Sequence, residues 1–427
     1  MRIHAFIVGG LCLVCAPFWA MGEESPAANA KEEEDSPYEQ LQVLARAMQL
    51  IRQDFVDDKK VSYRDLTYSA LRGMLASLDP HSQFMEPEDF QGMQEDTRSE
   101  FGGLGVVVTM EDGVLTIVAP MEDSPGFAAG LEPGDQILRV NGQSTDKLTL
   151  SEAIEKLRGE VGEKVTMTIR RPRTKEIKDY ELIRQIIKVP SVKGTRVLPA
   201  REGEPKIGYV RITQFNEPTA AELGRALDRL DKERIEGLIL DLRYNPGGLL
   251  GSAVDVCGFF VPPGTPIVTT EGRSPGREYS TSPQGAHPRT YPLVILVNYA
   301  SASGSEVVAG ALKDLDRAII LGETTFGKGS VQSVMSLPDG SAARFTTAKY
   351  YTPDRQVIHE HGVAPNIHAT LGTQEEIELL RARREGDSPT TKTAPTAKDS
   401  QLERAADALR GLLLKSKRAP TKASRAS

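Results

Sequence analysis

The sequence predicts a multidomain α/β protein with a helical N-terminal segment, a compact α+β unit, a larger layered core and a C-terminal helix. The length of 427 residues exceeds what one ordinary hydrophobic core organises. From about 186 to 370, short apolar runs alternate with helical stretches, which is typical of parallel strands covered by helices. From 98 to 172, β-branched runs are separated by Gly and Pro turns, which indicates a smaller β-rich unit.

The composition excludes several classes of protein. Hydrophobic residues make up 39% and charged residues 26% of the chain, as in ordinary globular proteins. The formal net charge of −7 argues against a nucleic-acid partner. His359 and His361 lack the acidic or cysteine companions that a metal site needs. We therefore expect no metal and no cofactor.

Residues 1–22 have the pattern of a secretory signal peptide. Arg2 supplies a positive charge, residues 3–19 are mostly apolar, and residues 20–22 fit a small-x-small cleavage site. We expect export, with the mature chain beginning at Glu23. A retained membrane anchor is the alternative, although the apolar run is short for a full span.

Residues 23–97 are predicted to form a linker and a small helical segment. Pro37, preceded by Ser36, marks the start of a helix, and an apolar stripe that includes Leu44 follows it. A second helix is expected from 62 to 78. These helices have little besides each other to bury, so we predict that they pair with another copy of the chain.

Residues 377–427 are predicted to form a linker, a helix and a basic tail. Ser400 and Glu403 have the spacing of a helix capping box. An apolar stripe around Leu409 follows. We expect the two terminal helices, around Leu44 and Leu409, to support homo-oligomerisation.

A glycine-flanked loop opens the unit 98–172 and runs into a strand. Free N–H groups of such a loop can hold a peptide carboxylate, while the strand edge pairs with the peptide backbone. This order of elements resembles a PDZ domain; a purely structural β unit is the alternative. The resemblance implies that the helix expected at 150–158 lines the groove, where Leu148 and Leu150 would favour apolar C-termini. The predicted carboxylate-binding residues are Gly103, Leu104, Gly105 and Val106.

Ser303 lies between a predicted buried strand, 293–297, and a predicted helix, 305–313. Free N–H groups at a helix N-terminus favour negative charge, which the oxyanion of acyl transfer requires. The ordinary alternative is a helix capping box of Ser303 with Glu306. The neighbouring Ser301 and Ser305 leave the choice of nucleophile open at this point.

Lys328 lies between two glycines, at the start of a β-rich run. A lysine that acts as a base must be desolvated, so that its pKa falls and the neutral amine is populated. The spacing of four residues would place Gln332 on the same strand face. A neutral amide there would orient the amine without raising its pKa. An exposed loop lysine is the alternative.

Three motifs together resemble the carboxyl-terminal processing peptidases, also called tail-specific proteases. They are LDLRYNPGG at 240–248, SASGSE at 301–306 and GETTFGKG at 322–329, and LDPHS at 78–82 is similar to the family's approach to its PDZ domain. The resemblance covers about residues 40–370. It implies a PDZ domain at 98–172 and a crotonase-like protease core at 173–376.

The resemblance also implies roles for individual residues. Ser303 would be the nucleophile, Lys328 its general base and Gln332 the residue that orients the lysine. The oxyanion hole would consist of the N–H groups of Gly304 and Gly248, with Gly247 as the other candidate. The chain departs from the family in two places: Gly304 stands where alanine is usual, and Tyr244 where asparagine is usual.

The implied function is that of an exported, periplasmic serine endopeptidase that recognises protein C-termini and cleaves upstream, and association with the membrane is a further expectation. Expected partners are protein substrates with apolar C-termini and a helical-repeat lipoprotein adaptor. Two alternatives are a non-catalytic PDZ adaptor and a crotonase-like acyl enzyme. A third is a Ser–His–Asp triad, for which the mature histidines are His81, His287, His359, His361 and His368.

Overall fold

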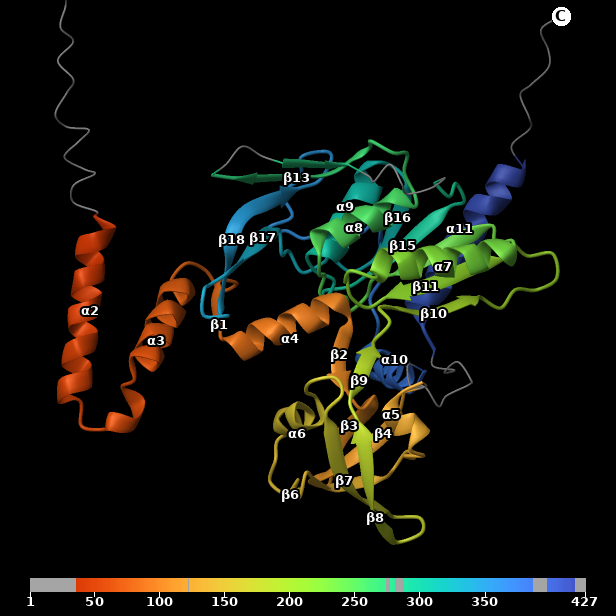
Figure 1. The fold of residues 1–427 in the computed structure, drawn as a ribbon. Helices are drawn as coiled ribbons and strands as arrows, with labels where there is room; N and C mark the ends of the chain where they lie inside the picture. Colours follow the sequence, from red (N-terminus) through yellow and green to blue (C-terminus); the bar gives the residue numbers. More distant parts are fainter. Residues whose placement is uncertain (1–35, 122, 274–276, 281–287, 387–397, 419–427) are drawn as a thin grey trace, which may run out of the picture. The chain divides into compact units, whose positions relative to one another are not determined.

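The computed structural model describes residues 36–121, 123–273, 277–280, 288–386 and 398–418 (Figure 1). The predicted signal peptide and its cleavage site lie outside these residues. Within them, no helix is sufficiently long and apolar to cross a lipid bilayer. The chain divides into two units, residues 1–73 and residues 74–427.

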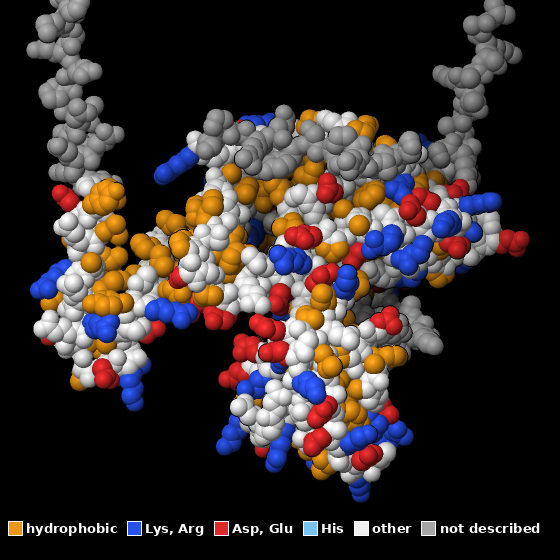
Figure 2. All heavy atoms as spheres, viewed as in Figure 1, with side chains coloured by type: hydrophobic (Ala, Val, Ile, Leu, Met, Phe, Trp, Pro, Cys, Tyr) orange, Lys and Arg blue, Asp and Glu red, His pale blue; other side chains and the backbone are white. Residues whose placement is uncertain are grey.

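The N-terminal unit is helical, as predicted. It contains α2 (Pro37–Asp54), the short helix η1 (Asp58–Lys60) and most of α3 (Tyr63–Ala76). No residue of α2 is buried, and Leu41 and Val43 are 58% and 66% exposed. Figure 2 shows hydrophobic side chains on the surface of these helices. The apolar stripe of α2 is therefore not covered by its own unit.

The α+β unit folds as one antiparallel sheet with two short helices. The sheet contains β3 (Val106–Glu111), β4 (Val114–Pro120), β5 (Gln136–Val140), β6 (Gln143–Ser144), β7 (Lys164–Arg171) and β8 (Glu176–Ile183). The helices are α5 (Pro125–Ala128) and α6 (Leu150–Leu157), and α6 begins with a capping box of Thr149 and Glu152. The sheet continues beyond residue 172, where the sequence placed its end, because β8 pairs with β7 along its whole length.

A two-stranded ribbon carries the chain into this unit and out of it. After α4 (Pro87–Arg98), β2 (Glu100–Gly103) pairs antiparallel with β9 (Gln185–Lys188). The ribbon thus joins two segments that lie more than eighty residues apart in the sequence.

The core is built on a six-stranded sheet, which is parallel except for its first strand. Its order is β10 (Val192–Val197), β11 (Ile207–Ile212), β12 (Gly237–Asp241), β15 (Leu293–Val297), β16 (Ala318–Gly322) and β19 (Ile367–His368). One face packs against α7 (Thr219–Lys232), α8 (Leu250–Gly258) and α9 (Gly304–Asp314). The other face packs against α11 (Ser400–Arg418). Side chains of a strand alternate between faces, so the buried apolar residues of these strands contribute to both layers.

A second sheet lies beside the helices of the core (Figure 1). It contains β1 (Gln83–Met85), β13 (Pro266–Gly272), β14 (Arg277–Ser280), β17 (Ser330–Ser336) and β18 (Ala342–Tyr351). β18 is central in it, because β1, β13 and β17 all pair with β18. The sheet thereby joins the segment before the α+β unit to the strand that carries Gln332.

The C-terminal helix corrects two expectations. Asp399 rather than Ser400 caps α11, because Asp399 Oδ1 accepts the N–H of Leu402 at 3.0 Å. Leu409 is fully buried against the chain's own central sheet. The stripe around Leu409 is therefore not available for self-association. A further helix, α10 (Thr373–Gly386), spans the predicted boundary at 376 and was not expected.

Candidate active site

The three predicted catalytic segments meet at one edge of the central sheet. They follow β12, β15 and β16, which are neighbouring parallel strands. The loops beyond the carboxyl ends of parallel strands are a common place for a ligand site. Hydrogen bonds join the loops to each other: Ala302 N–H donates to the Asn245 carbonyl, and Phe326 N–H donates to the Ser301 carbonyl, both at 3.0 Å.

Ser303 lies at the sharp turn between β15 and α9. Its φ of 52° and ψ of −113° are unusual for a residue other than glycine, and such strain concentrates at functional sites. Ser301 Oγ donates to the Leu242 carbonyl at 2.8 Å, and Ser305 Oγ donates to the Asn245 carbonyl at 3.0 Å. Both neighbouring hydroxyl groups thus hold the loops together, which leaves Ser303 as the candidate nucleophile.

The turn at Gly247 and Gly248 packs directly against Ser303. A Cβ on Gly247 would lie 2.6 Å from Ser303 Cβ and 2.8 Å from Gly304 N, and a Cβ on Gly248 would lie 2.1 Å from the Phe215 carbonyl oxygen. Their φ angles of 99° and 144° also favour glycine. Glycine is therefore required at both positions for the turn to approach the nucleophile.

The hydrogen bonds distinguish the predicted oxyanion donors. Gly247 N–H donates to Asn245 Oδ1 at 2.8 Å and is therefore already occupied. In the described part of the chain, the N–H groups of Gly248 and Gly304 make no hydrogen bond. Gly304 is also the first residue of α9, where the helix dipole favours negative charge. Gly248 and Gly304 are thus the better candidates for an oxyanion hole.

Lys328 lies half-buried in the loop between β16 and β17. Burial lowers the pKa of its amine, the positive charge of Arg344 acts in the same direction, and Glu306 opposes them. Among the described residues, no hydrogen bond joins Lys328 Nζ to Ser303 Oγ. The surroundings of Lys328 therefore suit a neutral amine, as a general base requires.

In the described part of the chain, Gln332 makes no hydrogen bond to Lys328. Its Nε2 donates to Ser330 Oγ at 2.8 Å and to Thr346 Oγ1 at 3.4 Å. We expected the shared face from a regular strand spacing, but a β-bulge lies between Val331 and Gln332. Because a bulge breaks the alternation of side chains, that spacing argument fails here.

Glu306 connects the nucleophile to the lysine loop. This residue is fully buried. Its Oε2 accepts the N–H groups of Ser303 and Lys328 at 2.8 Å and 2.9 Å. Its Oε1 accepts Gly327 N–H and Thr325 Oγ1, both at 2.6 Å. Burial raises the pKa of the Glu306 carboxyl, and these hydrogen bonds oppose the shift. The sequence indicated Glu306 only as half of a capping box.

The histidines that the structure describes form no triad with Ser303. In the described residues, no hydrogen bond links Ser303 to a histidine, and His287 lies outside those residues. Burial lowers the pKa of His81, and the charge of Lys328 adds to that effect, so His81 lies near the lysine. Nor do three His, Cys, Asp or Glu side chains gather as a metal site in the described part of the chain.

The predicted carboxylate loop lies at an open sheet edge. β3 pairs only with β4 within its sheet, so its other edge can accept an added strand. In the described structure, the N–H groups of Leu104 and Gly105 make no hydrogen bond. Gly105 has a φ of 65°, whereas Gly103 is paired within β2. The side chain of Leu104 is buried in the core of the unit.

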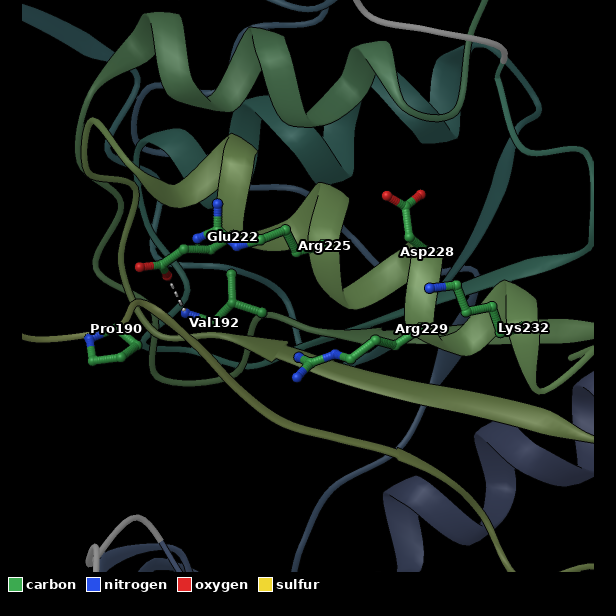
Figure 3. Close-up of a pocket in the computed structure, with 7 residues that line it drawn as sticks. All are labelled: Pro190, Val192, Glu222, Arg225, Asp228, Arg229 and Lys232. Atoms are coloured by element: carbon green, nitrogen blue, oxygen red, sulfur yellow. Dashed lines mark hydrogen bonds between the residues drawn. The ribbon is translucent and has the colours of Figure 1, made fainter. Parts of the chain in front are cut away.

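A separate cavity of about 540 Å³ lies along α7 (Figure 3). Glu222 Oε2 at its edge accepts the N–H groups of Ser191 and Val192 at 2.8 Å and 3.0 Å, which fixes the chain after β9 to α7. The lining residues are Pro190, Val192, Glu222, Arg225, Asp228, Arg229 and Lys232. None of these is a predicted site residue, so we assign the cavity no part in catalysis.

Comparisons with known proteins agree with this architecture. Residues 206–369 match the model of peptidase family S41, residues 116–171 a PDZ domain, and residues 14–89 the N-terminal domain of the activating protease CtpB. A carboxy-terminal-processing protease of Bartonella bacilliformis is 38% identical over 403 residues, which is 88% of this chain and 90% of the relative. CtpB of Bacillus subtilis is 35% identical over 343 residues, or 80% and 69% of the two chains.

A solved structure from Bacteroides fragilis, assigned to the S41 proteases, superimposes with a TM-score of 0.53 at 17% identity, covering 86% of this chain and 97% of that chain. This structural similarity shows that the two chains share a fold. The chain belongs to the S41 family of carboxy-terminal processing proteases, and it is a serine-type endopeptidase with a PDZ domain. The predicted family and enzyme class are confirmed.

The pH dependence of activity follows from the surroundings of Lys328. If the neutral amine accepts the Ser303 proton, kcat/KM should rise with pH through the pKa of Lys328. Replacing Arg344 with glutamine removes a positive charge that lowers this pKa. The pKa should then rise, and the pH profile of kcat/KM should move to higher pH. Arg355→Gln is the control, because it removes a cation from an exposed ion pair with Glu271. An Arg344→Gln profile that stays in place or moves to lower pH would contradict the assignment.

Proposed function

We propose that this protease captures exported proteins by apolar C-termini and cleaves them with Ser303 as nucleophile and Lys328 as base. The observation that carries the proposal is the meeting of the loops after β12, β15 and β16. They bring a strained serine, two N–H groups that have no acceptor among the described residues and a half-buried lysine to one sheet edge. Together these groups supply the components of acyl transfer.

In the proposed mechanism, neutral Lys328 Nζ takes the proton of Ser303 Oγ as that oxygen attacks the scissile carbonyl carbon. The N–H groups of Gly304 and Gly248 stabilise the oxyanion. The tetrahedral intermediate expels the amine, to which Lys328 returns the proton, and leaves an acyl-enzyme on Ser303. Lys328 then takes a proton from a water whose oxygen attacks the acyl carbon, and it returns that proton to Ser303 Oγ as the ester bond breaks and the acid is released. Gln332 would orient Lys328 only after leaving Ser330 and Thr346.

Recognition would use the edge of β3 and the loop before it. A peptide added to this edge would direct its carboxylate at the N–H groups of Leu104 and Gly105. Leu150, at the start of α6, is 37% exposed and offers an apolar contact for the last side chain. The processing names of the relatives support this choice of substrate.

Amidation of a substrate's C-terminus is expected to lower kcat/KM by about tenfold to a hundredfold, because the charge-assisted hydrogen bonds to the carboxylate are lost. The measurement compares one long substrate in free-acid and amide forms, well below saturation. A short peptide that contains only the cleavage site serves as control and should show no difference. Equal rates for the two long forms would leave the PDZ domain without a role in carboxylate recognition.

We also propose export to the periplasm, with association with the membrane, on the signal-like pattern of residues 1–22. N-terminal sequencing of the mature protein in each cell fraction tests this proposal, since a cytosolic protein that retains Met1 would contradict it.

The uncovered apolar stripe of α2 supports self-association, and light scattering of the protein with and without residues 36–55 tests it. We further propose that the protease binds a helical-repeat lipoprotein adaptor, which co-purification tests.

A further inference from the structure

A single carboxylate oxygen holds both loops that flank the candidate oxyanion hole. Glu376 Oε1, on α10, accepts the hydroxyl of Tyr244 at 2.6 Å and the hydroxyl of Tyr299 at 2.9 Å. The two rings meet edge to face, with centroids 6.2 Å apart. Tyr244 directly precedes the turn 245–248, and Tyr299 lies four residues before Ser303. Glu376 therefore bridges the oxyanion turn and the nucleophile loop.

The same helix, α10, also contacts the end of β12. Arg383, on α10, reaches Asp241 Oδ2 at 2.6 Å and lies 5.6 Å from the centroid of the Tyr244 ring. Asp241 is fully buried and paired with Arg243, which Asp399 contacts in turn. Buried charges remain stable only where their partners are fixed in good geometry. α10 and the start of α11 are thus tied firmly to the strand that leads into the oxyanion turn.

The backbone of Tyr244 needs such support. Its φ is 62°, in the left-handed region that a bulky side chain disfavours. Its N–H donates to Asn298 Oδ1 at 2.9 Å, which links it again to the nucleophile loop. A strained conformation persists only where the surroundings fix it. The hydrogen bond from the Tyr244 hydroxyl to the Glu376 carboxylate has a charged acceptor, and such bonds are stronger than those between two neutral groups.

We infer that Glu376 is a positioning residue for the oxyanion hole, acting through Tyr244 and Tyr299. The inference rests on the proposed roles of Gly248, Gly304 and Ser303. Loss of the shared acceptor would free Tyr244, and the Gly248 N–H would no longer be held at the place where the oxyanion develops. Stabilisation of the transition state would fall, while binding of the ground-state substrate would not change.

The test replaces Glu376 with alanine, which removes the acceptor oxygen of both tyrosine hydroxyls, and Tyr244 with phenylalanine, in the full-length protein. Each variant should lower kcat by about tenfold, less than the 10²–10³-fold of deleting an oxyanion donor, with KM unchanged. A peptide aldehyde, whose adduct with a serine places an oxygen in the hole, should lose affinity in parallel with kcat. Glu378→Ala is the matched control, because Glu378 lies on the same helix and bonds only Gln374 among the described residues.

The double variant should lose no more kcat than Glu376→Ala alone, because Glu376→Ala already removes the contact that Tyr244→Phe breaks. Wild-type kcat in Glu376→Ala, additive losses, or a raised KM with unchanged kcat would each overturn the inference. If Glu376→Ala lowers the melting temperature strongly, Tyr299→Phe tests the same carboxylate from a side chain that is 55% exposed. An inactive wild-type protein would instead refute the proposed function.

Discussion

Replacing Ser303 with alanine, or Lys328 with alanine, is expected to lower kcat/KM by at least about 10⁴-fold. Ser303→Ala removes the attacking oxygen, and Lys328→Ala removes the group that accepts its proton. The residual rate would come from the N–H groups of Gly248 and Gly304, which still polarise a bound carbonyl. The measurement is cleavage of a long protein substrate under single-turnover conditions, with circular dichroism to verify folding.

The double variant separates a dyad from two independent contributions. Groups that act in one proton transfer lose their effect together, so Ser303→Ala with Lys328→Ala should be no slower than Ser303→Ala alone. His81→Asn and His359→Asn serve as controls and should keep most of the activity. Complete loss in a folded histidine variant, with activity retained in Lys328→Ala, would favour a histidine base instead.

The sequence was sufficient to predict the parts of the site that depend on the succession of neighbouring segments along the chain. Each catalytic segment directly follows an apolar run, and apolar runs at helical intervals become neighbouring parallel strands. The segments containing Gly248, Ser303 and Lys328 therefore had to emerge at one sheet edge, as the structure shows. The helices expected at 62–78, 150–158 and 305–313 were predicted within a few residues for the same reason, because their boundary signals are local, whereas α4 and α10 were not predicted.

What the sequence did not indicate depends on contacts between distant segments. Three of the four groups that donate hydrogen bonds to Glu306 belong to a loop about twenty residues later. No periodic pattern in the sequence indicates that Glu306 and this loop are in contact. Leu409 has the same apolar spacing in a buried helix as in an exposed one, so its burial against the sheet was not foreseeable. The bulge before Gln332 is part of the pairing with β18, and it interrupts the regular alternation of side chains on which the spacing argument relied.

Glu306→Gln is expected to lower kcat by about tenfold to a hundredfold, with a smaller effect on KM. The glutamine amide has the size of the carboxylate but only one acceptor oxygen, so its NH₂ group must face N–H donors that Glu306 now satisfies. Those donors belong to Ser303 and Lys328 on one side and to Gly327 on the other. A small displacement of reacting groups can cost about a hundredfold in rate. Both loops would shift together, because they share this one side chain.

A second consequence of Glu306→Gln distinguishes a catalytic effect from a general loss of stability. The negative charge of Glu306 raises the pKa of Lys328 against the effects of burial and Arg344. Without that charge the Lys328 pKa should fall further, and the pH profile of kcat/KM should move to lower pH, opposite to Arg344→Gln. Glu323→Gln, in the same loop, controls for loss of a nearby negative charge and should leave the profile close to that of the wild type. A Glu306→Gln profile that does not move, or moves to higher pH, would show that Glu306 does not act on the lysine and that its role is confined to holding the two loops.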